Sequence, residues 1–135
     1  SLVVLMFGAN ESNRPGLVQR YQASLVPVLR GIRRAVPDTS CLVMAPMDRA
    51  DREDDDYRSN PWIPRIVEAQ RRSAFEAGCA FYDTYQAMGG DRSMVRWYRG
   101  GLASSDLTHP TVEGAAAIGQ GLFDALERAF AAGPR

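Results

Sequence analysis

Short apolar runs alternate with helical periodicities along this chain. Three of the runs predict strands, over residues 2–7, 41–45 and 79–82. The first run has no polar position and contains β-branched residues, which is typical of a strand buried on both faces of a parallel sheet. Gly8 ends this strand, and a polar loop with Asn10 follows it. Such a loop lies at the carboxyl edge of a parallel sheet, where α/β folds place their ligands.

Apolar positions spaced for one helical face separate the predicted strands. They predict helices over residues 15–36, 64–77, 84–88, 94–98 and 111–132. Pro27 lies inside the first of these helices, and proline removes a backbone hydrogen bond, so we expect a kink or a restart there. Residues 47–61 are mostly polar, and we expect a long loop beside the ligand-binding edge.

The order of these elements predicts the fold class. Strands that alternate with helices pair in parallel through right-handed crossovers, so we expect an α/β fold with three layers, α/β/α. The chain has 135 residues, of which 45% are hydrophobic, enough for one modest core and too few for two. We therefore expect a single domain over residues 1–135.

Composition and the absence of certain motifs argue against several classes of function. The formal net charge is +0, so no overall field favours nucleic acid or an anionic membrane surface. No apolar stretch approaches the ~20 residues of a membrane span. The chain has one histidine and no glycine-rich nucleotide motif, so we expect no metal and no cofactor. The acidic run at residues 51–56 lacks EF-hand spacing, and we expect a solvated loop there rather than a Ca²⁺ site.

The single histidine, His109, follows Asp106 by three residues and precedes Pro110. An imidazole that takes a proton from a serine needs its other nitrogen held by an acceptor, and an Asp-x-x-His turn supplies both groups. On these residues alone, a surface or helix-capping histidine is an equal alternative. The amide of Asn10 can donate to an oxyanion, although a turn or N-cap role is commoner for asparagine after a strand.

Two segments together resemble the SGNH (GDSL-type) hydrolase superfamily. Residues 8–11, Gly-Ala-Asn-Glu, are similar to its third sequence block, Gly-x-Asn-Asp, and residues 106–109, Asp-Leu-Thr-His, to its fifth, Asp-x-x-His. Glu11 replaces the usual aspartate, which alters a loop contact. The resemblance covers essentially the whole chain and implies a flavodoxin-like SGNH hydrolase fold.

The resemblance also implies roles for four residues. His109 is the expected general base, and Asp106 is the carboxylate that orients it. Asn10 is the expected oxyanion-hole donor, with Gly8 beside it in the same block. Together they imply a serine esterase without a cofactor.

The first and second blocks of the family are absent from this chain. They precede the third block and carry the nucleophilic serine of Gly-Asp-Ser and an oxyanion glycine. We therefore interpret the chain as the carboxyl-terminal part of such a hydrolase, with its amino-terminal strands missing and inactive alone. The strand at residues 2–7 then forms an open edge, which predicts pairing with an amino-terminal fragment of the same protein or a homo-oligomer.

Nucleophiles inside the chain are poorly placed. No serine, Ser104 and Ser105 included, lies in a Gly-x-Ser-x-Gly elbow. Cys41 and Cys79 start strands at the edge opposite His109. If these strands are adjacent, the cysteine Cα atoms lie ~5 Å apart, within disulfide range. An exported protein permits that bond, whereas a cytosolic protein keeps two thiols.

Three further segments, residues 45–50, 78–83 and 88–90, are similar to a bacterial subgroup of exported SGNH esterases that act on acetylated carbohydrate, including relatives of peptidoglycan O-acetyl esterases. This implies a periplasmic or extracellular esterase acting on an O-acetylated carbohydrate, or an O-acetyltransferase with the same triad. A non-catalytic carbohydrate-binding or scaffold module is the alternative. Trp97 and Tyr98 could line a sugar site, although we expect packing beneath the catalytic loop.

Overall fold

Three parallel strands form the central sheet. The computed structural model describes residues 1–54 and 56–133. The strands β1 (Leu2–Met6), β2 (Ser40–Met44) and β5 (Ala80–Tyr82) pair in the order β1-β2-β5. The register places Val3 beside Cys41 and Val43 beside Phe81. The sheet confirms the predicted α/β fold with parallel strands.

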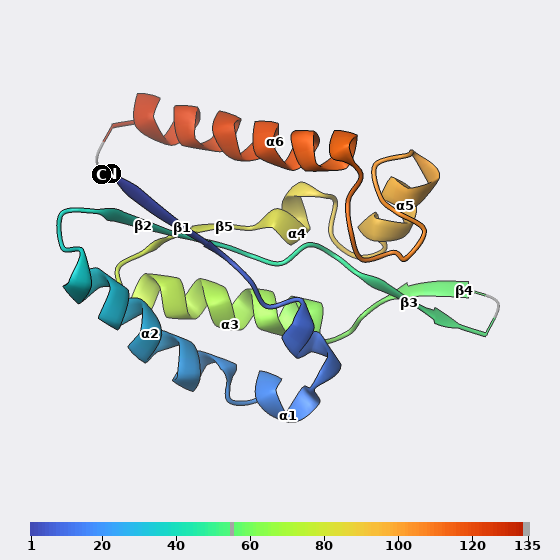
Figure 1. The fold of residues 1–135 in the computed structure, drawn as a ribbon, viewed down its shortest axis with the longest axis horizontal. Helices are drawn as coiled ribbons and strands as arrows, with labels where there is room; N and C mark the ends of the chain where they lie inside the picture. The colour runs from blue at the N-terminus through green and yellow to red at the C-terminus, as the bar shows by residue number, and fades with distance from the viewer. Residues whose placement is uncertain (55, 134–135) are drawn as a thin grey trace.

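Helices lie on both sides of this sheet. They are η1 (Asn10–Asn13, a 3-10 helix), α1 (Pro15–Val18), α2 (Tyr21–Ala35), α3 (Ile63–Glu76), α4 (Thr84–Ala87), α5 (Ser93–Arg99) and α6 (Val112–Ala131). Helices α2 and α3 lie on one side of the sheet, and α4 and α6 lie on the other (Figure 1). The three predicted layers are therefore present. No helix in the described part of the chain is both long and apolar enough to cross a membrane.

The main core lies between β2 and the helix pair α2 and α3. Leu29, Val43 and Ile66 are fully buried there, one from each element. Apolar residues at helical spacing in α2 and α3 face the strand, while β2 contributes four consecutive buried side chains. Strand β2 is thus the part of the sheet that best matches the prediction of a strand buried on both faces.

The helix does not restart at Pro27, although a restart is one of the two outcomes expected there. The first helical segment instead divides at residues 19–20, between α1 and α2, and α2 continues through Pro27. Pro27 and Ala23 are both exposed, so the carbonyl of Ala23, which loses its helical partner, is near solvent. Burial of Leu25 and Leu29 on the opposite face keeps the helix intact.

The expected long loop over residues 47–61 contains a β-hairpin. Strands β3 (Ala50–Glu53) and β4 (Asp56–Ser59) pair antiparallel and project from the carboxyl end of the sheet (Figure 1). Charged residues have low strand propensity, which is why the sequence pattern favoured a loop. Cross-strand ion pairing between Arg58 and Glu53, 3.3 Å, supports the hairpin instead.

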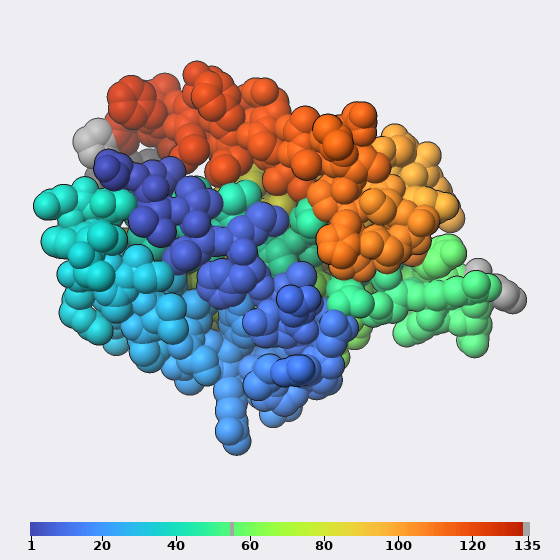
Figure 2. Space-filling view, in the orientation of Figure 1, coloured from blue at the N-terminus to red at the C-terminus, as the bar shows by residue number. Residues whose placement is uncertain are grey.

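One face of β1 is uncovered among the described residues, contrary to the expectation of burial on both faces. Leu2, Val4 and Met6 are each more than two-fifths exposed. Figure 2 shows β1 at the surface between α6 and α2. The apolar side of α6 is also largely uncovered, with Val112 83% and Phe130 91% exposed. The edge of β1 opposite β2 also has no strand partner in the described ranges, so apolar side chains remain exposed there.

A disulfide joins Cys41 and Cys79 at the amino end of the sheet. Their Cα atoms lie 4.8 Å apart, and both residues are buried in the main core. Cys41 starts the buried part of β2, while Cys79 directly precedes β5. The structure therefore forms the bond that the sequence left open.

Replacing both cysteines, in the variant Cys41→Ala/Cys79→Ala, should lower the free energy of unfolding by about 2 to 4 kcal/mol, because the bond closes a long loop in the unfolded chain. Chemical denaturation measures this difference. As a control, dithiothreitol should destabilise the wild type and leave the double variant unchanged. An equal midpoint for the wild type with and without reductant would contradict this prediction.

Candidate active site

Asp106 and His109 are in direct contact, as their spacing predicts. His109 Nδ1 lies 2.7 Å from Asp106 Oδ2. The other carboxylate oxygen accepts hydrogen bonds from the backbone N–H groups of Thr108, 3.0 Å, and His109, 3.1 Å. Both oxygens of Asp106 are therefore used, one to fix the turn and one to hold the imidazole.

The segment that carries this pair, residues 103–110, is called the dyad loop below. Ala103 and Pro110 close its base as an antiparallel bridge. Leu107 lies at its tip with a φ of 53°, in the left-handed region that side chains rarely adopt. Burial of Leu107 and a 3.0 Å hydrogen bond from the Ala50 N–H to its carbonyl hold this conformation. The backbone reversal at Leu107 lets Asp106 and His109 face each other.

Electrostatics fix the roles of the two imidazole nitrogens. The hydrogen bond from His109, followed by the two backbone N–H bonds, lowers the pKa of Asp106 from 3.8 to about 2. An ionised carboxylate only accepts, so Nδ1 of His109 carries the proton of that bond in neutral imidazole. Nε2 has no hydrogen-bond partner among residues 1–54 and 56–133, and the side chain is 73% exposed. Nε2 is therefore free to accept a proton.

Asn10 and Gly8 lie in the turn that follows β1. Gly8 is buried with a φ of 115°, and a β-carbon there would lie 2.9 Å from Gln70 Nε2 and 3.0 Å from Ile66. Only glycine fits this turn without strain. Asn10 is exposed at the start of η1, and its side chain makes no hydrogen bond within the described ranges. The commoner roles of asparagine, as a turn or N-cap acceptor, are therefore not realised by its side chain.

The turn after β1 and the dyad loop share the carboxyl edge of the sheet. The turn after β1 and the dyad loop both lie at the end of the sheet from which the hairpin projects (Figure 1). No hydrogen bond in the described part of the chain joins Asn10 to Asp106 or His109. A hollow of about 440 Å³ adjoins Asn10 and is also lined by Glu11, Asn13, Arg14 and Leu17.

Among the described residues, no serine or cysteine side chain bonds the imidazole of His109. Ser104 contacts the histidine through its backbone, where its N–H donates to the His109 carbonyl at 2.8 Å. No serine hydroxyl bonds Nε2 in the portion that the structure describes. Cys41 and Cys79 are joined to each other, away from the dyad loop. The arrangement thus pairs an imidazole with a carboxylate, and no nucleophilic side chain bonds that imidazole among residues 1–54 and 56–133.

A protein-family model matches most of this chain. The model of the GDSL-like Lipase/Acylhydrolase family matches residues 1–117. The chain belongs to this family. The resemblance seen in the sequence is thereby confirmed, and the match includes both the turn after β1 and the dyad loop. No curated protein sequence matches the chain.

Two solved structures share the GDSL fold seen here. One, titled "Peptidoglycan O-acetylesterase in action, 5 min", has a TM-score of 0.87 and 25% sequence identity, covering 94% of this chain and 37% of that chain. The other is a putative GDSL-like lipase from Parabacteroides merdae ATCC 43184, with a TM-score of 0.71 and 18% identity, covering 92% of this chain and 59% of that chain. This chain therefore spans less than two thirds of either protein.

Residues that the sequence did not single out support the turn after β1 at the candidate site. Gln70, fully buried on α3, donates to the carbonyl of Phe7 at 2.8 Å and to the Tyr21 hydroxyl at 3.0 Å. These bonds fix the end of β1, directly before Gly8. Burial raises the pKa of Tyr21 to about 12, so its hydroxyl stays neutral.

Asp48 is the second supporting residue, and sequence analysis places it in the segment 45–50 without assigning it a role. Its fully buried carboxylate accepts hydrogen bonds from the Ser59 hydroxyl, 2.9 Å, and from the Met94 N–H, 2.9 Å. Burial is the largest cause that raises the pKa of Asp48. Asp48 thus ties the hairpin to α5. Helix α5 also contributes Trp97, which packs in one cluster with Leu107 and donates to the Met88 carbonyl, confirming its expected place beneath the dyad loop.

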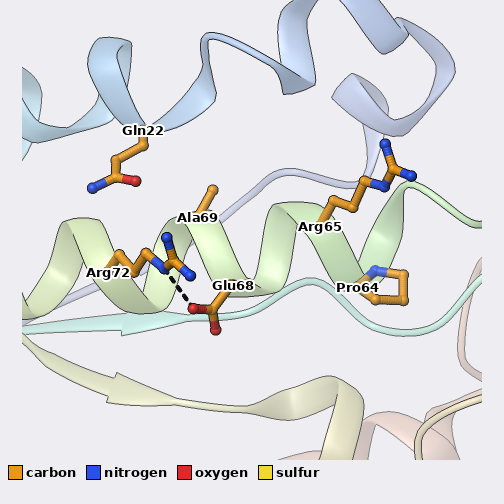
Figure 3. A pocket seen from close by; sticks show the side chains of 6 residues that line it. All are labelled: Gln22, Pro64, Arg65, Glu68, Ala69 and Arg72. Carbon is orange, nitrogen blue, oxygen red and sulfur yellow. Dashed lines mark hydrogen bonds and ion pairs between the residues drawn. The ribbon is translucent and has the colours of Figure 1, made fainter.

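A separate hollow of about 360 Å³ lies between α2 and α3 (Figure 3). It is lined by Gln22, Pro64, Arg65, Glu68, Ala69 and Arg72. Glu68 is paired with Arg72 there at 2.6 Å. None of the predicted site residues lines this hollow, so it does not extend the candidate site.

The pKa of Asp106 provides a test of the dyad. Carbon-13 NMR titration of its carboxyl group should give a midpoint of about 2 in the wild type. His109→Ala removes the largest cause and should raise that midpoint toward 3.8. Because folding lowers this pKa, its stabilising contribution is complete above 3.8 and is lost as the pH falls toward about 2.

Asp56 is the matched control for this titration. Its pKa is lowered mainly by the Tyr57 N–H, which His109 does not contact. Its midpoint should therefore be the same in the wild type and in His109→Ala. Equal Asp106 midpoints in the two proteins would show that the His109 contact does not form in solution.

Proposed function

We propose that this chain is part of a serine esterase that removes acetyl groups from an O-acetylated carbohydrate. The observation that carries the proposal is the 2.7 Å contact between Asp106 Oδ2 and His109 Nδ1, which leaves Nε2 free. Membership in the GDSL-like family supports ester hydrolysis. The structural likeness to a peptidoglycan O-acetylesterase, with 25% identity, supports an acetylated carbohydrate as the substrate.

The proposed reaction begins with proton removal from a serine by His109 Nε2. The serine oxygen attacks the ester carbonyl carbon, and Asp106 stabilises the imidazolium that forms. The Asn10 amide donates to the tetrahedral oxyanion, a contact worth roughly 3 to 4 kcal/mol of barrier in comparable sites. The imidazolium then gives its proton to the leaving sugar oxygen as the carbon–oxygen bond breaks. Water, activated by the same nitrogen, releases acetate from the acyl-serine.

We also propose that the serine comes from a segment of the same protein outside residues 1–135. The edge of β1, which has no strand partner among the described residues, supports this, because a further strand there would bring a loop to the same carboxyl edge. The uncovered side of β1 gives such a segment an apolar surface on which to pack. The acetylesterase chain, of which this chain covers 37%, shows that a related protein is much longer.

The disulfide supports a proposal on location. A bond between Cys41 and Cys79 forms and persists in an oxidising compartment. We propose a periplasmic or extracellular protein. Fractionation of the cells that make it should recover the protein outside the cytoplasm with both cysteines resistant to alkylation. Recovery from the cytoplasm with two free thiols would contradict this location.

Three substitutions in the complete protein test the reaction. His109→Ala should abolish acetate release, because the serine loses its base. Asp106→Asn should lower kcat by up to about 10⁴-fold, since the imidazole remains but in the wrong tautomer. Asn10→Ala should lower kcat on the order of a hundredfold with little change in KM. The assay measures acetate released from p-nitrophenyl acetate and from an O-acetylated glycan.

A fluorophosphonate reagent, which labels activated serines, identifies the nucleophile in the same wild-type protein. Mass spectrometry should find the label on a serine outside residues 1–135. Label on Ser104 or Ser105 would contradict the proposed source of the serine. Full activity of His109→Ala would contradict the proposed mechanism. If the wild type releases acetate from the glycan no faster than from p-nitrophenyl acetate, only the assignment of a carbohydrate substrate is contradicted.

A further inference from the structure

Consecutive residues after β2 bind the two loops that carry the candidate site. Arg49 Nη1 donates to the Asn13 Oδ1 of η1 at 2.8 Å. The next residue, Ala50, donates its N–H to the carbonyl of Leu107 in the dyad loop at 3.0 Å. One short backbone segment therefore sets the distance between η1, which begins at Asn10, and the dyad loop.

The guanidinium of Arg49 is held from the side opposite Asn13. Its Nη2 lies 3.3 Å from Asp51 Oδ1, and Asp51 Oδ2 accepts from Asn60 Nδ2 at 2.9 Å. The Asn60 N–H also donates to the Arg49 carbonyl at 2.8 Å. The Arg49 side chain is only 19% exposed, although arginine is usually solvated. A planar guanidinium fixed in this way presents its second donor nitrogen in one direction, toward η1.

We propose that Arg49 is a positioning residue for the oxyanion donor. Asn13 is the last residue of the single turn that Asn10 begins, so a hydrogen bond to Asn13 restrains the whole turn. Through Asn13, Arg49 holds the Asn10 amide at a fixed place relative to the dyad loop. An oxyanion donor is effective because it is fixed before the charge develops. Arg49 itself contacts no reacting atom, and its role rests on the proposed esterase function.

Arg49→Met in the complete protein tests this role, because methionine keeps an unbranched apolar side chain and removes the guanidinium. We expect kcat to fall about tenfold with little change in KM, since the Asn10 contact strengthens only in the transition state. The kcat of Arg49→Lys should lie between those of the wild type and Arg49→Met. An ammonium group can donate to Asn13 but cannot also reach Asp51. Arg52→Met is the matched control: Arg52 lies three residues further along, in β3, and among the described residues its side chain donates to the carbonyl of Asp54, so kcat should be unchanged.

A double variant separates positioning from a general loss of stability. If Arg49 acts through the Asn10 amide, Arg49→Met should have no further effect in the Asn10→Ala background. The double variant and Asn10→Ala alone should then give the same kcat. A further tenfold fall in the double variant would overturn the proposal.

Hydrogen exchange gives a readout that does not depend on activity. The Arg14 N–H donates to the Glu11 carbonyl across η1 at 2.9 Å. Its exchange should accelerate in Arg49→Met and stay at the wild-type rate in Arg52→Met. Unchanged exchange in Arg49→Met would overturn the proposal. If the wild type releases no acetate, the proposed function fails by itself, and this exchange measurement still decides whether Arg49 holds η1.

Discussion

Strand β2 pairs with β1 on one side and with β5 on the other, and its last four side chains are buried. Both neighbouring strands take their register from it. Its carboxyl end leads through residues 45–47 into Asp48, Arg49 and Ala50, which bind α5, η1 and the dyad loop. A displacement of β2 would therefore change the core and both halves of the candidate site together. The position of β2 therefore determines the geometry of the candidate site.

The elements that the sequence predicts well are those set by short-range patterns. Apolar runs located all three parallel strands, and helical spacing located α3 and α6, because burial is periodic along each element. The Asp106–His109 contact could also be predicted, since both groups lie in one turn. The family resemblance added Asn10, whose place on the same edge follows from the parallel topology.

The features that the sequence did not reveal depend on partners far along the chain. Asp48 binds residues 11 and 46 positions away, and Arg49 binds a residue 36 positions away. A polar segment with such partners is not distinguishable from a solvated loop by composition. Pairing of two charged strands, Ala50–Glu53 and Asp56–Ser59, is likewise a property of the pair. Sequence analysis names the segment 45–50, but the contacts of Arg49 and Asp48 become apparent only in the folded chain.

The disulfide has a consequence for the integrity of the polypeptide. Cys41 and Cys79 enclose the hairpin and α3 in a covalent ring. The hairpin projects from the body of the molecule and carries exposed residues, where a protease gains easiest access. A single cut there would leave both fragments covalently joined, with β1, β2 and β5 still linked through the core. Nicked protein would therefore migrate as one species until reduced.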